Sequence, residues 1–409
     1  MTESFSRRKL RITMEITVKH ITGMAEALLP YQIEFRRHLH RRPELSNEEF
    51  ATTTLIKKEL ARHKIKIRPL HMKTGAVGLI NPGRKPAVAL RTDIDALPIS
   101  ERTHLPFRSE IEGRMHACGH DIHMAVVLGT AVILNRLREQ IPGCVEILFQ
   151  PAEEAPPGGA ERLIREGVLD KPKVEIIFGL HVDPTLTTGR ISLRDGPTMA
   201  AVIDFDLTII GEGGHAAVPH RAVDAIAVTA EVIDSVQKII SREVNPMKSA
   251  VITFGKIKGG TTRNVIADRV QLSGTIRTLD PANTRHVPRL LKRTVSGICR
   301  ARGARFQLDF LTGYPVLANH ALVNHILEKT YIKLRGKKYI ELTPPTMGGE
   351  DFSFYLEKVP GAMFRLGIKN KKIGADKPWH SPEFVADEKS IFHGTALLAL
   401  AVLEYFKGT

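Results

Sequence analysis

The first half of the chain alternates between strand-like and helix-like hydrophobic patterns. Residues 24–41 have helical spacing, and Ser46-Asn47-Glu48-Glu49 matches a capping box that would open a second helix. A further helix is expected at 160–167. Short apolar runs occur at 75–80 and 86–91, a buried strand is expected at 145–150, and another strand is expected at 174–180. A strand, a helix and a strand at this spacing form a βαβ unit, so this part is predicted to be α/β with a mainly parallel central sheet.

The pattern changes after about residue 195. Apolar and polar residues alternate over 203–209, as in a half-exposed strand. The element expected next is a helix whose apolar positions are Ile226, Ala230, Ile233, Val236 and Ile240. Strands at 249–257 and 268–278, a helix at 281–301 and a strand at 306–310 are expected after it. The order β-α-β-β-α-β is that of a ferredoxin-like α+β module.

Helical patterns at 320–334 and 389–406 return to the first type of fold, so the module is inserted. We expect a catalytic domain made of residues 1–195 and 312–409, with a lid or dimerisation domain at 196–311 between them. Residues 1–23 are expected to be an extension, and Met14 is an alternative start. Ser6-Arg7-Arg8-Lys9-Leu10 resembles a twin-arginine export signal, but no sustained apolar run follows it.

The composition fits an ordinary globular protein. The 409 residues are 43% hydrophobic, and no stretch approaches the ~18 apolar residues that span a bilayer. The 59 Lys and Arg exceed the 44 Asp and Glu, so the formal charge is +15. Few aromatic residues lie among the basic ones, so we expect a small-molecule substrate rather than nucleic acid or a membrane.

Three cysteines, Cys118, Cys144 and Cys299, are an odd number spread over a long chain. This argues against a disulfide framework and predicts a reducing, cytoplasmic environment.

The densest chemical signal is His116-Ala117-Cys118-Gly119-His120-Asp121, which leads into an apolar helix. The thiolate of Cys118 and the imidazole of His120 can converge on one zinc-like cation. Taken alone, this segment fits equally well a buried cysteine beside surface histidines.

Two adjacent carboxylates, Glu153 and Glu154, follow the strand at 145–150. Open α/β sheets bind ligands at the carboxyl ends of their strands. Adjacent residues in an extended segment point in opposite directions, so one carboxylate can bind metal while the other faces substrate. The residues alone do not say which is which, and two solvated glutamates remain the alternative.

Two more histidines extend the set. His181 follows the strand at 174–180, and His380 lies in a loop near the C-terminus. Five candidate ligands are sufficient for two metal ions sharing a bridging water: Cys118, His120, Glu154, His181 and His380.

Seven motifs occur along the chain in a fixed order. They are R-x-D-x-D-A-L-P at 91–98, H-A-C-G-H-D at 116–121, Q-P-A-E-E at 150–154, G-L-H at 179–181, G-G-H-A-A-x-P-H at 213–220, G-G-E-D-F at 348–352 and H-S-P-x-F at 380–384. From about residue 30 onward, the chain resembles the amidohydrolase branch of the aminoacylase/carboxypeptidase metallopeptidases. That branch includes hippurate hydrolase, indoleacetyl-amino-acid hydrolases and N-acyl-L-amino acid amidohydrolases.

The resemblance implies roles for particular residues. The five candidate ligands would form a di-metal centre, and Glu153 would be the general base. His215 would polarise the scissile carbonyl, in the neighbouring subunit's site, while Asn264 and Arg277 would hold the substrate carboxylate. Arg277 lies on the strand face opposite Ile276. Without the resemblance, it would be interpreted as a solvent-exposed arginine with no role in binding.

Together these features predict metal-dependent hydrolysis of the amide bond of N-acyl amino acids, releasing a carboxylic acid and a free amino acid. The alternatives are a dipeptidase or carboxypeptidase, an N-acyl-diaminopimelate deacetylase, and a metal-dependent binding protein without turnover. Manganese, zinc, cobalt and nickel all suit mixed Cys/His/Glu ligands. A homodimer or homotetramer formed through the inserted domain is expected.

Overall fold

The computed structural model of the chain describes residues 16–408, so the expectations on Met14 and on residues 6–10 lie outside it. Helix α1 (Val18–Arg41) begins earlier than expected, because Thr17 caps its first turn and Ile21 is fully buried. Residues 18–23 are therefore part of the fold rather than of an extension.

The larger part of the molecule contains an eight-stranded sheet in the order β1-β2-β4-β3-β5-β16-β6-β15. The strands are β1 (Lys66–Arg68), β2 (Ala76–Ile80), β3 (Ala87–Asp93), β4 (Cys144–Gln150), β5 (Val174–Thr187), β6 (Ile191–Ser192), β15 (Ile340–Glu341) and β16 (Gly361–Lys369). The four central strands, β4, β3, β5 and β16, run parallel, as predicted, while β2 and β6 flank them antiparallel.

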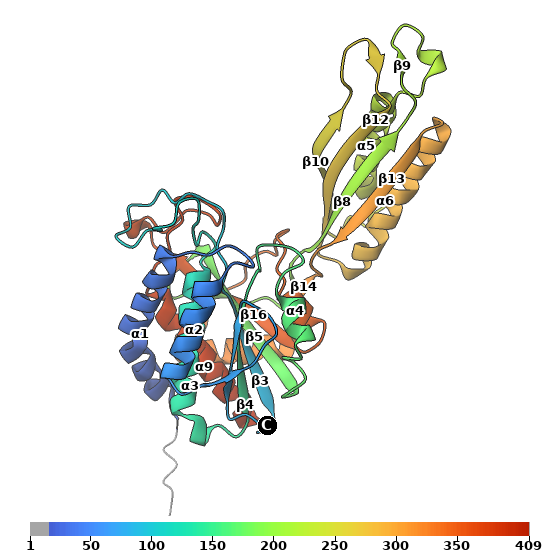
Figure 1. The fold of residues 1–409 in the computed structure, drawn as a ribbon. Coiled ribbons are helices and arrows are strands. Elements are labelled where there is room, and N and C mark those ends of the chain that lie inside the picture. Colours follow the sequence, from blue (N-terminus) through green and yellow to red (C-terminus); the bar gives the residue numbers. More distant parts are fainter. Residues whose placement is uncertain (1–15, 409) are drawn as a thin grey trace, which may run out of the picture.

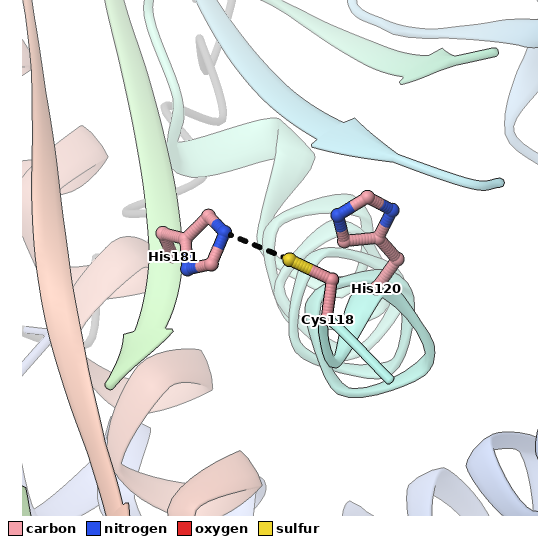
Figure 2. Close-up of side chains that lie close together, drawn as sticks. All are labelled: Cys118, His120 and His181. Atoms are coloured by element: carbon pink, nitrogen blue, oxygen red, sulfur yellow. Dashed lines mark hydrogen bonds between the residues drawn. The ribbon is translucent and has the colours of Figure 1, made fainter. Parts of the chain in front are cut away.

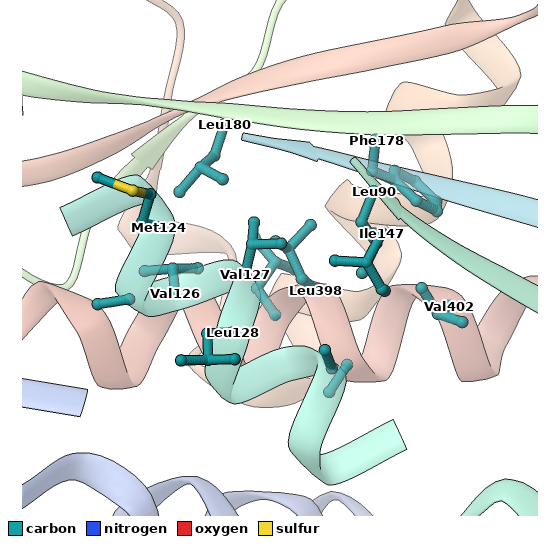
Figure 3. Close-up of a cluster of buried hydrophobic side chains, with 14 of the residues drawn as sticks. Leu90, Met124, Val126, Val127, Leu128, Ile147, Phe178, Leu180, Leu398 and Val402 are labelled. Atoms are coloured by element: carbon teal, nitrogen blue, oxygen red, sulfur yellow. The ribbon is translucent and has the colours of Figure 1, made fainter. Parts of the chain in front are cut away.

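Helices cover both faces of this sheet. One face is covered by α1, α2 (Phe50–Arg62), α3 (His120–Arg136), α7 (Ala321–Leu334) and α9 (Ser390–Gly408), and the other by α4 (Ala160–Arg165) and α8 (Ser353–Leu356). Figure 3 shows the main core, where side chains of α3 such as Val127 and of α9 such as Leu398 gather beneath the sheet. Along β3, Leu90 enters this core and Ala89 enters the opposite one, because successive side chains alternate between faces.

The inserted domain, which runs from β8 to β13, extends away from the large sheet (Figure 1). Its elements are β8 (Ala201–Ile210), α5 (Ala225–Arg242), β10 (Ala250–Gly259), β12 (Arg269–Thr278), α6 (Pro281–Ala301) and β13 (Arg305–Thr312). The sheet order is β10-β12-β8-β13 with antiparallel neighbours, and α5 and α6 pack on it around a separate core. The predicted β-α-β-β-α-β order is confirmed.

Short elements complete the structure. They are β7 (Gly196–Met199), β9 (Gly214–His215), β11 (Val265–Ile266), β14 (Leu317–Asn319), and the 3-10 helices η1 (Arg138–Gln140), η2 (Pro219–Arg221), η3 (Lys337–Tyr339) and η4 (Lys371–Ile373). The β9–β11 pair lies at the far end of the inserted domain (Figure 1). None of the helices between residues 16 and 408 combines the length and apolarity needed to cross a membrane.

Three local predictions were wrong. The capping box is absent, because the Ser46 hydroxyl donates to Asp95 and the carboxylate of Glu44 accepts the first N–H groups of α2. Strand β5 does not end at His181 but continues to Thr187, since β16 pairs with it along this length. Ile226 of α5 is 51% exposed, because the helix packs through Val228 and Val232 in addition to the expected Val236.

Candidate metal centre and substrate cleft

The loop before α3 brings Cys118 against β5. Gly119 adopts φ 87°, and an added Cβ there would lie 2.6 Å from Cγ2 of Val182. Glycine therefore permits both the turn and the close approach to the strand. As Figure 2 shows, Sγ of Cys118 lies 3.4 Å from Nε2 of His181, with the His120 ring on the other side of the thiol.

Both histidines in Figure 2 are oriented by main-chain carbonyls. Nδ1 of His120 lies 2.9 Å from the Asp95 carbonyl oxygen, and Nδ1 of His181 lies 2.8 Å from that of Val182. A carbonyl can only accept, so each Nδ1 carries the hydrogen and each Nε2 keeps its lone pair. Nε2 of His120 is buried without a hydrogen-bond partner, as a ligand atom would be.

Glu154 and His380 approach the same place from two loops. Oε1 of Glu154 lies 3.8 Å from Nε2 of His120 and 3.5 Å from Nε2 of His380, and it too is buried without a hydrogen-bond partner. Asp95 accepts the backbone N–H of Glu154 at 2.9 Å, and Ala117 accepts that of His380 at 2.9 Å. His380 has φ 62°, a left-handed conformation that is costly outside glycine and common at functional sites.

The five predicted ligands thus converge, and we call them the donor cluster: Cys118, His120, Glu154, His181 and His380. Cys118, His120 and His181 form one group whose donor atoms lie within 4.8 Å of one another, and Cys118, Glu154 and His380 form another. The two groups share the thiol. Sulfur, imidazole and carboxylate donors with unpartnered buried atoms fit divalent transition metals.

The electrostatics of the donor cluster favour bound cations. Burial, together with Glu154 and Glu153, raises the pKa of the Cys118 thiol well above its ordinary value. Burial opposes protonation of His120, but nearby carboxylates outweigh it and raise the pKa of His120 to about 10. Both shifts express a surplus of negative charge, which divalent cations would neutralise in place of protons.

The Glu153 carboxylate lies between the donor cluster and two further acids. Ala152 before it has φ 54°, and the hydroxyl of Tyr314 donates to the Glu153 carbonyl oxygen at 2.6 Å. The Glu153 carboxylate groups with Glu350 and Asp351, although it also remains within reach of His120. Burial, followed by Glu350 and Glu154, raises the pKa of Glu153 well above its usual range.

A buried network behind the site was missed by sequence reasoning. The Arg91 guanidinium donates to Asp93 at 2.8 Å, Asp351 at 2.7 Å and Gln150 at 2.9 Å. These residues lie in three of the motifs, but the motifs gave no indication that their side chains meet. Asp93 also holds Nδ1 of His123 at 2.7 Å.

His123 and Asp121, which also lie near the centre, have other partners. Nε2 of His123 accepts the Val182 N–H at 2.9 Å, so that ring is not free to bind metal. Asp121 binds His40 at 2.8 Å and Arg36 at 2.6 Å, which ties the start of α3 to α1. Among Asp93, Asp95 and Asp121, Asp95 therefore contacts the donor cluster most directly.

A cavity of about 560 Å³, here called the substrate cleft, opens beside the donor cluster. Arg277 of the inserted domain lines it together with Glu153. The Arg277 guanidinium bonds only to Thr275 Oγ1 at 3.1 Å and the Met347 carbonyl at 3.3 Å, so within residues 16–408 it has no carboxylate partner. Arg365 and Trp379 also line the cleft, and sequence reasoning did not identify either.

His215 and Asn264 are not brought to the donor cluster of the same chain. They line a different cavity, of about 680 Å³, beside the β9–β11 pair at the far end of the inserted domain (Figure 1). Nδ1 of His215 accepts the Ala217 N–H at 3.0 Å, which leaves Nε2–H as a donor.

Comparison with known proteins places this geometry among hydrolases. The model of peptidase family M20/M25/M40 matches residues 89–404. N-acetyl-L-cysteine deacetylase of Bacillus subtilis (strain 168) is 41% identical over 367 residues, covering 90% of this chain and 86% of the relative. IAA-amino acid hydrolase ILR1-like 5 of Arabidopsis thaliana is 36% identical over 385 residues, covering 93% and 88%.

A solved structure agrees. The Bacillus subtilis YXEP protein, described as a dinuclear metal binding peptidase, superposes with a TM-score of 0.81 at 34% identity, over 92% of this chain and 98% of that one.

Proposed function

The chain belongs to peptidase family M20/M25/M40, and from this premise we propose that it hydrolyses the amide bond of N-acyl amino acids. The products are a carboxylic acid and a free amino acid. The observation that carries the proposal is the shared substrate cleft, which is lined by four residues of the donor cluster, by the buried Glu153 and by Arg277. Relatives named for deacetylation and for hydrolysis of amino acid conjugates support it.

Two divalent metal ions would be held by the donor cluster, one by each of the two groups that share Cys118. Bound there, they would supply the Lewis acidity that activates water and polarises the amide carbonyl. Manganese, zinc, cobalt and nickel remain the candidates, because softness and geometry of these mixed ligands do not select among them.

Glu153 would move the proton. Its carboxylate accepts a proton from the attacking water and donates it to the amide nitrogen as the carbon–nitrogen bond breaks. Burial and the neighbouring acids make this carboxyl a stronger proton acceptor than an exposed glutamate, as a general base requires. Arg277 would bind the substrate's α-carboxylate through its planar guanidinium.

We further propose that His215 and Asn264 act in the site of a partner subunit. Their distance from the donor cluster of the same chain supports this, as does the free Nε2–H of His215, which suits an oxyanion. Ile226 on α5 and Val251 and Ile257 on β10 are exposed apolar residues, and β10 is an edge strand. This surface supports a homodimer, or a homotetramer, formed through the inserted domain.

Two further features follow from the same reading. Residues 196–311 would form the inserted lid, with residues 1–195 and 312–409 as the catalytic domain. Cys118, Cys144 and Cys299 are all free, which supports a reducing, cytoplasmic environment.

The function is tested by free-amine release from N-acetyl, N-benzoyl and indoleacetyl amino acids and from dipeptides. Manganese-reconstituted protein is compared with chelator-treated protein. Chelator-sensitive cleavage of the acyl amino acids in preference to dipeptides is the expected result. Preference for dipeptides would instead make the protein a peptidase, and no cleavage by metal-loaded protein would favour a binding role.

A further inference from the structure

Arg365 is a cation in the substrate cleft that the proposed reaction does not use. It lies on β16, where it pairs in register with His181 of the parallel strand β5. Its neighbours along β16, Phe364 and Leu366, enter the main core, so Arg365 projects from the opposite face. It lines the cleft together with Glu153 and the donor cluster residue His181.

The guanidinium of Arg365 is held in a fixed plane. It lies over the ring of Trp379, 5.4 Å from the centroid. The indole N–H of Trp379 donates to the Val182 carbonyl at 3.0 Å, which fixes the ring. Stacking occupies one face of a guanidinium and leaves the N–H groups at its edge available.

Those N–H groups have no protein acceptor. Within residues 16–408, no hydrogen bond or ion pair of the Arg365 side chain is formed. The two acids whose negative charges act most strongly on the Arg365 guanidinium are Asp183 and Glu350. Glu350 already pairs with Arg91 at 3.0 Å, and Asp183 accepts two hydrogen bonds from Thr185, at 2.8 and 2.6 Å.

Two fully buried arginines, Arg36 and Arg91, differ from Arg365 because both are paired with acids. Arg36 pairs with Asp121 at 2.6 Å, and Arg91 pairs with Asp93 and Asp351 at 2.8 and 2.7 Å. Arg365 is instead half-buried at the wall of the cleft, and a guanidinium that faces a cavity without a protein acceptor can bind an anionic ligand there. Unlike Arg36 and Arg91, Arg365 has no acid as a partner among residues 16–408, so its acceptor would be a ligand bound in the cleft.

We propose that Arg365 binds a second carboxylate of the substrate, in addition to the α-carboxylate bound by Arg277. This rests on the proposed function and specifies its substrate class as N-acyl amino acids with a further negative charge. Bound metal would balance the Cys118 thiol and the Glu154 carboxylate, and Glu350 is already paired with Arg91. Glu153 and Asp204 are the other acids that line the cleft, and Arg277 and Arg365 are its two arginines, each able to complement one carboxylate. The formal charge of +15 would also attract such a dianion.

Two matched substrate pairs test the proposal and locate the second carboxylate. N-succinyl-L-alanine and N-butyryl-L-alanine have acyl chains of the same length and differ in a terminal carboxylate. N-acetyl-L-glutamate and N-acetyl-L-glutamine differ in the same way on the amino acid side. In one of the two pairs, kcat/KM for the anionic substrate should exceed that for the neutral substrate by about 10-fold or more. This is the gain expected when a charge-assisted hydrogen bond forms to the additional carboxylate. Equal values within both pairs would overturn the proposal.

Variants then assign the preference to Arg365. R365Q is expected to reduce the ratio of anionic to neutral kcat/KM by about 10-fold or more, and R365K by less, because a lysine keeps the charge without the fork. R165Q, which removes an exposed arginine of α4, is the charge-matched control and should keep the wild-type ratio. If R365Q lowered kcat/KM equally for both members of each pair, Arg365 would be a structural partner of Trp379 and the proposal would be wrong.

A binding measurement separates this inference from the proposed function. Calorimetric titration of the metal-loaded wild-type protein with succinate and with butyrate should give tighter binding of succinate, and the difference should disappear in R365Q. If the wild-type protein hydrolysed none of the four substrates, the proposed function would fail. The titration would still decide whether Arg365 binds a second carboxylate.

Discussion

The main chain of Asp95 and the ring of His120 are joined by a hydrogen bond of 2.9 Å, which fixes the tautomer of the histidine. The Asp95 carboxylate adds two more contacts, from the Ser46 hydroxyl at 2.6 Å and from the Glu154 N–H at 2.9 Å. One aspartate therefore positions two members of the donor cluster from outside it.

Replacing Asp95 by alanine should weaken metal binding by about 10- to 100-fold, because the Glu154 loop loses its acceptor. Metal affinity can be measured by competition with a chelating dye. S46A removes one contact of Asp95 and none of Glu154, so it should have a smaller effect. Wild-type affinity in D95A would show that the loop is held by other contacts.

Glu153 and Glu154 should respond differently to the same substitution. E153Q should keep its metal and lose turnover by about 10²- to 10⁴-fold, the range expected for removal of a general base. E154Q should lose metal, because Glu154 lies between His120 and His380. Metal analysis and kinetics on both variants check this. If E153Q also lost metal, the base and the ligand would have been confused.

Cys118 should be the thiol that governs sensitivity to oxidants. It lines the substrate cleft, whereas Cys144 and Cys299 are buried and do not. C118A is expected to bind metal weakly, and its residual activity should no longer respond to thiol oxidants. C299A is the matched control and should respond like the wild type. Persistent sensitivity in C118A would transfer the role to one of the other cysteines.

The sequence predicted four of the five members of the donor cluster because they flank strongly apolar segments: Cys118 and His120 lead into α3, Glu154 follows β4 and His181 lies in β5. Strands such as β4 and β5 are hydrophobic enough to be identified locally. Strand β3 lies between them and pairs parallel with both, so Glu154 and His181 lie toward the same edge of the sheet. The residue at which β5 ends could not be predicted from its own sequence, because it depends on pairing with β16, which is far away in the chain.

The hydrogen-bond and ion-pair partners of individual side chains could not be predicted from the sequence. Ser46 has the right residue type and spacing to cap α2, yet its hydroxyl bonds to Asp95, which only the folded chain brings near. Arg365 is one arginine in an apolar strand, and its missing acceptor is evident only once its neighbours are in place. The β-α-β-β-α-β order was local and correct, whereas the packing face of α5 was misjudged at Ile226 because two faces of that helix are apolar.

Glu146 makes the stability of the protein depend on pH. Burial raises its pKa to about 8, although Arg68 at 3.1 Å opposes the shift. The folded state thus holds this proton more tightly than the unfolded state, in which a glutamate has a pKa of about 4.3. The resulting stabilisation is complete below that lower value and is lost as the pH rises toward 8.

The E146Q variant cannot ionise at this position, so it should lack that loss. Its melting temperature relative to the wild type should rise by about 3 °C or more between pH 5 and pH 8.5. E139Q, which alters a side chain that is 65% exposed, is the control and should follow the wild type at both pH values. Parallel melting curves for E146Q and the wild type would contradict a protonated Glu146 in the fold.

A shared active site predicts complementation between two inactive variants. H215A keeps Glu153 but lacks the histidine that would serve the partner subunit, and E153Q has the opposite defect. In co-expressed, differently tagged chains that pair at random in dimers, about one quarter of all sites contain both intact residues. Those sites should give about one quarter of the wild-type activity, and each variant alone should remain inactive.

The outcome depends on which chain supplies His215. If His215 served the site of its own chain, every site in the mixture would lack one of the two residues and no activity would return. Purifying the mixed dimer through both tags sharpens the comparison, because half of its sites should then be intact. A second dimer serves as the comparison: one chain carries both H215A and E153Q, and the other is wild type. The activities of the two dimers distinguish the two arrangements. In that pairing a shared site leaves no intact site, since each site lacks either Glu153 or the partner's His215, whereas a site within one chain leaves half of them active.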